Sequence, residues 1–243
     1  MSGHSKWSTI KRAKGAADVK RSASFSRLAN AVIVAAKNGG GNQDSNFSLR
    51  MAIDKAKAAS MPKDNIERAI KRGTGEIAGA IIEEMLYEAI GPANTGILIE
   101  ATTDNKNRTA PEVKTALTKY GGKFASTGAV SYQFTKLGKI LVDSTGTNKE
   151  DLELAAIDAG SEDFSEEGDD LAIFTKPTEL DQVRKTLEAN GIIIKEVSFS
   201  WEPKDVIKID DKVVAEKLLT LMHALDEVED VVNVYANFVI NDD

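Results

Sequence analysis

The sequence of 243 residues contains no cysteine, only five prolines and two histidines, and few aromatic residues (6%). The absence of cysteine excludes disulfides, cysteine-ligated zinc, iron–sulfur clusters and thiol catalysis, and it fits a reducing compartment. No hydrophobic run approaches the roughly 18 residues that mark a membrane-spanning helix. The first thirty residues are basic and serine-rich but lack the apolar stretch of a secretory signal. We therefore expect neither a membrane partner nor secretion.

Composition is typical of a folded protein, but charge is unevenly distributed. Hydrophobic residues make up 42% and charged residues 28% of the sequence, close to the averages of globular domains. The formal charge is −7, yet residues 1–75 hold 15 basic and 5 acidic side chains, whereas residues 76–243 hold 16 basic and 33 acidic ones. The balance is −1 over 76–138, −10 over 139–203 and −6 over 204–243. This asymmetry predicts a basic module for polyanions on an acidic body.

The N-terminal part predicts a basic arm followed by a small helical domain. Residues 1–21 contain six Lys or Arg side chains and few large apolar groups. Apolar residues then recur with the helical period of 3.6. They mark three helices: from Ser22 or Ser24 as cap to the glycines 39–41, about 45–59, and from Pro62 to Gly73.

After Gly75 strands alternate with helices. The expected elements are strands at 81–90, 97–101 and 129–134, a helix from the capping box Thr109–Glu112 to about Tyr120, a turn at 136–138, and a strand at 139–142. A second capping box at 147–150 opens a helix to Ala159, followed by strands at 162–165 and 171–175, a helix from Thr178 to Asn190, and a strand at 192–201. The last expected elements are a strand at 206–209, a helix opened by Asp210, and a strand at 231–240.

This order predicts an α+β multidomain protein with an N-terminal three-helix domain and two α/β sandwich domains of the ferredoxin-like βαββαβ type. Elements after Pro203 are too few to fold alone but can complete the sheet begun at residue 81. We therefore expect the last sandwich to be inserted into the middle one. The predicted boundaries are 1–75, 76–136 with 204–243, and 137–203.

Basic residues of the arm and helical domain are the first candidate site. Cations interleaved with an aromatic residue can neutralise phosphates while the ring stacks on a base. The candidate nucleic-acid-binding residues are Lys6, Trp7, Lys11, Arg12, Lys14, Lys20, Arg21, Arg27, Lys55, Lys57, Arg68, Lys71 and Arg72, and Arg50 is a further cation on these helices. The alternative for each is a solvated basic surface with Trp7 docked on its own domain. Their number, with few carboxylates between them, favours nucleic acid.

A second candidate is the segment 103–109, which links a predicted strand to a capped helix. The side chains of Asn105, Lys106, Asn107 and Arg108 can present donors to a phosphate, a carboxylate or a partner beside free backbone N–H groups. A self-capping Asx turn explains the same residues, and the sequence favours neither interpretation.

Metal and catalytic signals are weak. Six carboxylates lie within residues 161–170, but the EF-hand spacing is absent and a hairpin tip explains them, so no metal site is predicted. The sequence has no HExxH, GxSxG, Walker A or GxGxxG motif, and its two histidines, His4 and His223, are far apart. We expect no catalytic residue and no cofactor; an enzyme using the Asn105–Arg108 loop is a remote alternative without a nucleophile or general base.

Four blocks of the sequence resemble the YebC/PmpR family. They are Gly3-His4-Ser5-Lys6-Trp7, the run from Met61 to Glu76, Tyr87-Glu88 before Gly91-Pro92, and Thr103 to Thr109. The resemblance covers most of the chain, although Ala29-Asn30-Ala31 and the turn 124–128 depart from the usual pattern. It implies three domains, with the third inserted into the second, and a non-enzymatic regulator of gene expression. Because the first block begins at residue 3, we expect a bacterial, cytoplasmic member without a transit peptide.

The resemblance leaves two kinds of nucleic-acid partner open. Family members are described as DNA-binding transcriptional regulators and as ribosome-associated factors that help elongation through difficult sequences such as proline runs, and a mitochondrial relative activates translation of a cytochrome oxidase subunit. Duplex DNA binding needs a recognition element, which no helix here clearly shows. The charge distribution favours rRNA or tRNA held by the basic end, with the acidic domain kept from phosphate or meeting proteins.

Overall fold

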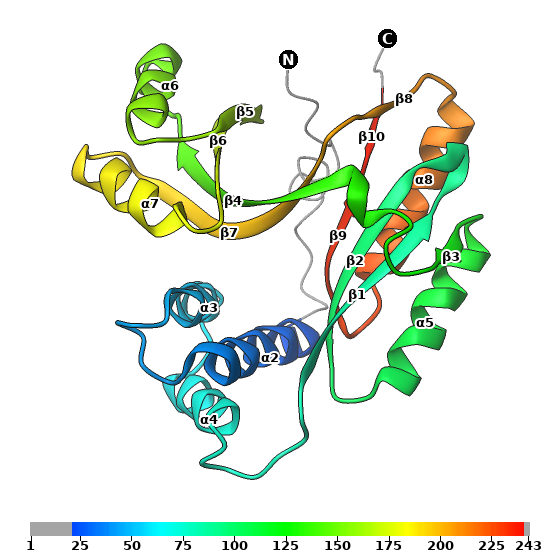
Figure 1. Ribbon diagram of the computed structural model, residues 1–243, viewed down its shortest axis with the longest axis horizontal. Coiled ribbons are helices and arrows are strands. Elements are labelled where there is room, and N and C mark those ends of the chain that lie inside the picture. The colour runs from blue at the N-terminus through cyan, green and yellow to red at the C-terminus, as the bar shows by residue number, and fades with distance from the viewer. Residues whose placement is uncertain (1–20, 241–243) are drawn as a thin grey trace. The chain divides into compact units, whose positions relative to one another are not determined.

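The computed structural model describes residues 21–240 and confirms an α+β protein of several domains (Figure 1). Two compact units are formed, each from two stretches of chain: residues 21–130 with 211–234, and residues 131–210 with 235–240. The three domain boundaries expected from the sequence stay a prediction.

Three helices open the first unit, as the apolar period predicts. They are α2 (Arg21–Gly39), α3 (Phe47–Ala58) and α4 (Lys63–Gly73). Their shared core contains Val32 and Ile33 from α2, Leu49 and Ile53 from α3, and Ile66 from α4. Figure 1 shows α2 lying between the other two helices. This small module gives the candidate cations a rigid base.

Contact between α2 and α4 is close because Gly73 has no side chain. A Cβ atom at Gly73 would lie 2.4 Å from the carbonyl oxygen of Ile33 and 2.7 Å from the Cβ of Ala36. Gly73, the last residue of α4, is thus a packing contact with α2. Gly75, with a φ of +82°, adopts the left-handed conformation beyond the helix.

The rest of the first unit is a four-stranded sheet with two helices. Its strands follow the order β3-β1-β2-β9. The bounds are β1 (Glu83–Ile90), β2 (Gly96–Thr103), α5 (Lys106–Lys119), β3 (Lys123–Ala125), α8 (Lys212–Asp226) and β9 (Val231–Ala236). Ile97 and Ile99 of β2, Leu117 of α5 and Leu221 of α8 are fully buried, and α5 and α8 pack together (Figure 1). Segments far apart in sequence thus complete one sandwich.

The second unit contains the expected ferredoxin-like sheet, in the order β5-β6-β4-β7 with all neighbours antiparallel. Its elements are β4 (Phe134–Asp143), α6 (Lys149–Asp158), β5 (Asp163–Glu167), β6 (Asp170–Thr175), α7 (Leu180–Ala189) and β7 (Ile194–Pro203). A parallel pair, β8 (Ile207–Ile209) with β10 (Phe238–Ile240), joins its two chain segments. The tip of the β5–β6 hairpin lies at Gly168, as predicted.

The turn predicted at 136–138 and the strand predicted at 129–134 were wrong. A short 3₁₀ turn spans Ser131–Gln133, and β4 continues through 136–138 without interruption. Gly138 is there because a Cβ atom would lie 2.5 Å from Thr175 Oγ1 and 2.9 Å from the Cβ of Leu180. The missing side chain lets the first turn of α7 pack directly against β4, so this glycine marks a close approach of two elements and not a chain reversal.

Several helix and strand ends also differ from the prediction. Ser22 and Ser24 lie within α2, and the side chains that cap α5, α6 and α8 are those of Asn105, Asn148 and Asp211. In α7 the residue before the first turn is Glu179, whose side chain makes no cap. The final strand is interrupted at Asn237, and β3 was missed because three residues carry too little periodicity.

Replacing Gly73 by alanine tests the helix contact. We expect a loss of about 1–3 kcal/mol in the free energy of unfolding, because the methyl group would overlap backbone and not a movable side-chain end. Chemical denaturation followed by circular dichroism measures it. Gly75→Ala is the comparison, since its Cβ would meet open space and the positive φ alone costs about 1 kcal/mol. An equal loss in both variants would contradict the packing role of Gly73.

Candidate nucleic-acid interface

Three cations lie together on the last two turns of α4. Arg68 and Arg72 are four residues apart on one face, Lys71 lies beside them, and all three belong to the set predicted to bind nucleic acid. Arg68 and Lys71 are exposed and Arg72 is half-buried. No side-chain hydrogen bond or ion pair joins any of them to another residue within 21–240. We call these three residues the α4 cluster.

Other predicted cations of the helices are engaged with the protein. Arg27 donates to the backbone carbonyl oxygens of Asp226, Val228 and Glu229 at 3.0, 2.7 and 2.9 Å. Asp226 is the last residue of α8 and the other two lie in the turn that follows, so the guanidinium lies at the negative end of the helix dipole. Arg27 therefore joins the helices to the sandwich, a role that its sequence position did not reveal.

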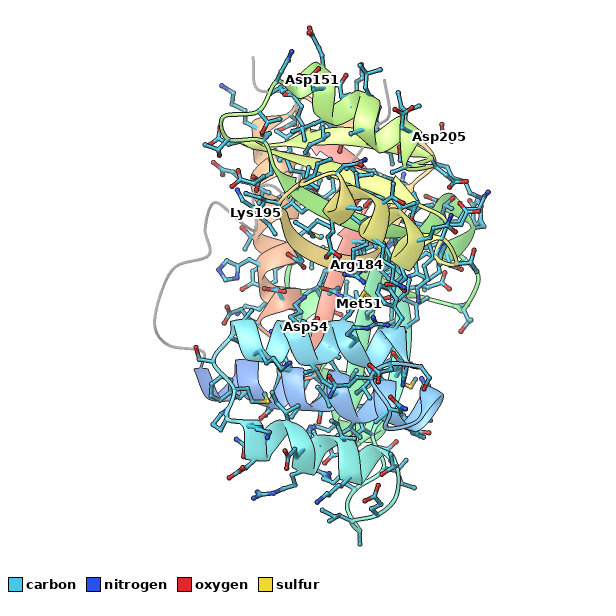
Figure 2. All side chains as sticks on the ribbon, turned by 90° about the vertical axis from the view of Figure 1, so that its left-hand side faces the viewer. Met51, Asp54, Asp151, Arg184, Lys195 and Asp205 are labelled. Carbon is cyan, nitrogen blue, oxygen red and sulfur yellow. The ribbon has the colours of Figure 1, made fainter. Side chains whose placement is uncertain are left out.

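The cations of α3 differ from those of α4. Lys57 forms an exposed ion pair with Asp54 at 3.8 Å, and Lys55 is exposed on the same helix. Arg50 stacks 5.6 Å above the Phe47 ring. Figure 2 shows Asp54 and Met51 projecting from α3. Lys57 therefore has an acidic partner, whereas the residues of the α4 cluster form no ion pair within residues 21–240.

Part of the predicted set lies outside the described residues. These side chains are Lys6, Trp7, Lys11, Arg12, Lys14 and Lys20. Arg21 is the first residue of α2. For these positions the nucleic-acid interpretation stays a prediction.

An open groove between α2 and α4, which the sequence did not reveal, adjoins the α4 cluster. Its volume is about 240 Å³, and its walls include Phe25, Ala29, Met61, Asn65, Arg68 and Arg72. The small side chains of Ala29 and Ala69 face it from opposite helices. Apolar surface therefore lies directly beside guanidinium groups that have no ion-pair partner within residues 21–240.

Residues 103–109 fold as a self-capping turn, one of the two interpretations left open. The Asn105 side chain accepts hydrogen bonds from the backbone N–H groups of Asn107 and Arg108. Lys106 forms an ion pair with Glu83 at 2.9 Å. Arg108 contacts Asp104 at 3.2 Å and Asp230 at 2.8 Å. Lys106 and Arg108 are thus paired with carboxylates of the protein, and an anion or partner contact of Asn105, Lys106, Asn107 and Arg108 stays a prediction.

Asp230 is the centre of this turn, and sequence reasoning missed it. Its carboxylate is 7% exposed and accepts hydrogen bonds from Thr109 Oγ1 at 2.6 Å, Thr103 Oγ1 at 2.9 Å and Arg108 Nη2 at 2.8 and 2.9 Å. Its backbone oxygen accepts the N–H of Thr102 at 2.9 Å. No local pattern could reveal a partner more than 120 residues away from Arg108 and Thr109.

Ionisation of Asp230 is favoured despite its burial. Desolvation alone would raise the pKa of this carboxyl, but hydrogen bonds from Thr109, Arg108 and Thr103 outweigh it and hold the pKa below its ordinary value. The same hydrogen bond to Asp230 raises the pKa of Arg108. The pair is therefore charged near neutral pH.

Every basic side chain of residues 139–203 is paired with a carboxylate. The pairs are Lys139–Glu167, Lys149–Glu166, Lys176–Glu162 and Lys176–Glu179, Arg184–Asp181 and Arg184–Glu188, Lys185–Asp181, and Lys195–Asp143 and Lys195–Asp170. Arg184 on α7 and Lys195 on β7 are labelled in Figure 2. This segment has no cation left for phosphate, and its acidic hairpin is held by lysines of neighbouring elements.

No group of three or more His, Cys, Asp or Glu side chains within residues 21–240 is placed to share a metal ion. Nor is any helix of that range long and apolar enough to cross a membrane.

Comparison with known proteins agrees with this architecture. Residues 5–76 match the family model described as the TACO1/YebC protein N-terminal domain, and residues 82–238 match that of the TACO1/YebC second and third domain. A "probable transcriptional regulatory protein" of Desulfotalea psychrophila is 47% identical over 243 residues, covering 100% of this chain and 97% of the relative. One of Caldanaerobacter subterraneus is 44% identical over 244 residues and covers both chains completely.

A solved structure is also similar. The crystal structure of a conserved hypothetical protein from Aquifex aeolicus aligns with a TM-score of 0.87 at 41% sequence identity, covering 93% of each chain. The fold is thus shared along nearly the whole chain.

Replacing Asp230 by asparagine tests the turn. We expect the free energy of unfolding to fall by about 2–3 kcal/mol, less than for a fully buried ion pair because Arg108 is 41% exposed and can be hydrated. Urea denaturation measures the loss. Asp104→Asn is the control, because its carboxylate is 43% exposed and an exposed pair contributes at most about 1 kcal/mol.

The pH dependence separates charge from packing. A carboxyl with a lowered pKa in the folded state stabilises the protein above its unfolded pKa of about 3.9 and loses that contribution as pH falls toward the folded value. Between pH 5 and pH 3 the wild type should therefore lose more stability than Asp230→Asn. Parallel curves for the two proteins would rule out this role for the charge of Asp230.

Proposed function

The chain belongs to the TACO1/YebC family, and on that premise we propose that it is a non-enzymatic regulator of gene expression that binds structured RNA on the ribosome. In this proposal it acts in the cytoplasm as a translation factor that helps elongation through difficult sequences, such as proline runs. The basic N-terminal part grips rRNA or tRNA, and the acidic segment 139–203 stays away from phosphate or contacts protein.

The observation that supports this proposal is the distribution of unpaired cations. In the α4 cluster three adjacent basic side chains have no partner within residues 21–240, whereas all six basic side chains of 139–203 are paired. Binding to a phosphate backbone gains free energy from counterion release, which requires cations not already neutralised by the protein. The α4 cluster meets that requirement.

A second candidate, a DNA-binding transcriptional regulator, is favoured by the names of the relatives. Direct reading of duplex DNA places a helix or ribbon in a groove. The cationic side of α4 faces a groove shared with α2, and this geometry suits an irregular phosphate backbone better than insertion into DNA. We therefore rank the RNA proposal first.

Sedimentation of a lysate through a sucrose gradient distinguishes the two candidates. The RNA proposal expects the protein to migrate with ribosomal particles at low salt and to leave them at high salt, because phosphate contacts are screened. Replacing Lys6, Lys11, Arg12 and Lys14 by alanine should reduce this association. Recovery of the protein only with chromosomal DNA would reject the ribosomal proposal in favour of the DNA one.

The α4 cluster is tested by the salt dependence of tRNA binding. Replacing Arg68, Lys71 and Arg72 by alanine should weaken binding and reduce the slope of log K against log salt by about 2–3, since each lost phosphate contact contributes about 0.7–0.9. Fluorescence anisotropy with labelled tRNA at several salt concentrations measures both.

A matched control removes three cations elsewhere. Lys149, Lys176 and Lys185 are more than half exposed but paired with carboxylates, so their replacement by alanine should leave the slope unchanged. If both triple variants lose affinity equally, net charge explains binding and the α4 cluster has no special part in it.

A further inference from the structure

The groove between α2 and α4 has the chemistry of a site for one unpaired nucleotide. Its floor is apolar, with Ile33, Met61 and Ala69 buried and Phe25 partly buried. Pockets for drug-sized ligands enclose about 300–1,000 Å³. A volume of about 240 Å³ is therefore suited to a single ring system.

Most polar groups of the groove belong to the face of α4 that borders it, and Ser26 of α2 adds a hydroxyl from the opposite wall. Asn65, Arg68 and Arg72 follow one another at spacings of three and four residues, so they form a row along one side. The amide of Asn65 can donate to and accept from the edge of a base, and the two guanidinium groups can bind phosphate or stack on a ring. Among residues 21–240, no carboxylate lines the groove.

We propose that this groove binds an unpaired base of RNA, with the base on the Phe25–Met61 floor and the adjoining phosphate at Arg68 and Arg72. The inference rests on the proposed function and specifies which feature of the RNA is bound. Recognition of structured RNA commonly uses bases released from loops and bulges that stack on aromatic or guanidinium groups. An acidic peptide could also meet two arginines, but the apolar floor beside them matches the alternation of base and phosphate along a strand.

The test compares two RNA hairpins that differ by one bulged nucleotide. The full-length protein should bind the bulged hairpin about ten-fold more tightly than the fully paired one, since stacking of one base is worth roughly this factor or more. Fluorescence anisotropy at fixed salt gives both dissociation constants. A 4-thiouridine at the bulge should crosslink to the peptides that contain Phe25 or Met61.

Filling the groove without changing charge supplies the decisive variant. Ala29→Leu should abolish the ten-fold preference while leaving binding to the paired hairpin intact, because the added side chain enters the base site and not the phosphate contacts. Ala58→Leu makes the same change at an exposed position of α3 and should keep the preference. Circular dichroism melting of both variants verifies the fold.

If Ala29→Leu impairs folding, Arg72→Ala replaces it, with Lys63→Ala as control on the same helix. Lys63 is 87% exposed and pairs with Glu67, so only Arg72→Ala should reduce the preference for the bulge. Equal binding of both hairpins by the wild type would overturn the groove proposal and leave the proposed function standing. Failure to bind either hairpin would reject both. A preference unchanged in Ala29→Leu, or crosslinks confined to other peptides, would place the base elsewhere.

Discussion

One buried carboxylate, that of Asp230, joins the two stretches of chain that form the first unit of this protein. Asp230 lies between α8 and β9, while the groups that bind it, Thr103, Thr109 and Arg108, lie more than 120 residues earlier. A buried carboxylate is tolerated only where hydrogen bonds and an opposite charge replace its lost hydration, and here they do so with enough excess to keep it ionised. The same carboxylate therefore fixes the start of α5 and the point at which the chain re-enters the sheet.

Arg27 extends this junction to the helical module. Its guanidinium binds the carbonyls at 226, 228 and 229, immediately before Asp230, so the end of α8 is held by α2 on one side and by the start of α5 on the other. The α4 cluster then follows from the packing of α4 on α2 at Gly73. A surface that binds nucleic acid needs such a rigid base, because phosphate contacts are effective only when the cations are already positioned.

Sequence periodicity was sufficient for the existence of the helices and of most strands, because each depends on neighbours within a few residues. Periodicity and local motifs gave wrong predictions where the same amino acid can serve either a local turn or cap or a tertiary contact. Gly138 suggested a turn, but it lies within β4 and lets α7 pack closely against that strand. The Thr109–Glu112 pattern suggested a helix cap, but Thr109 lies inside α5 and donates a hydrogen bond to Asp230. The α4 cluster was among the predicted residues, but the groove beside it depends on the distance between two helices, which no single-helix pattern contains.

The sequence blocks that carry the family resemblance can be divided by what folding already explains. Glu88 accepts the N–H groups of Gly128 and Val130, and Thr103–Thr109 surrounds Asp230. Within the run from Met61 to Glu76, Ile66 and Ala69 are core, Lys63 pairs with Glu67, Thr74 with Glu76, and Gly73 meets α2. Within residues 21–240 folding gives no comparable role to the side chains of Asn65, Arg68, Lys71 and Arg72. Asn65, Arg68 and Arg72 line the apolar groove, and Lys71 lies beside the two arginines on the same helix. The other residues named in this block take part in folding within residues 21–240. Side chains that do not, and that lie at helical spacing on the same helix, are those expected of a binding surface.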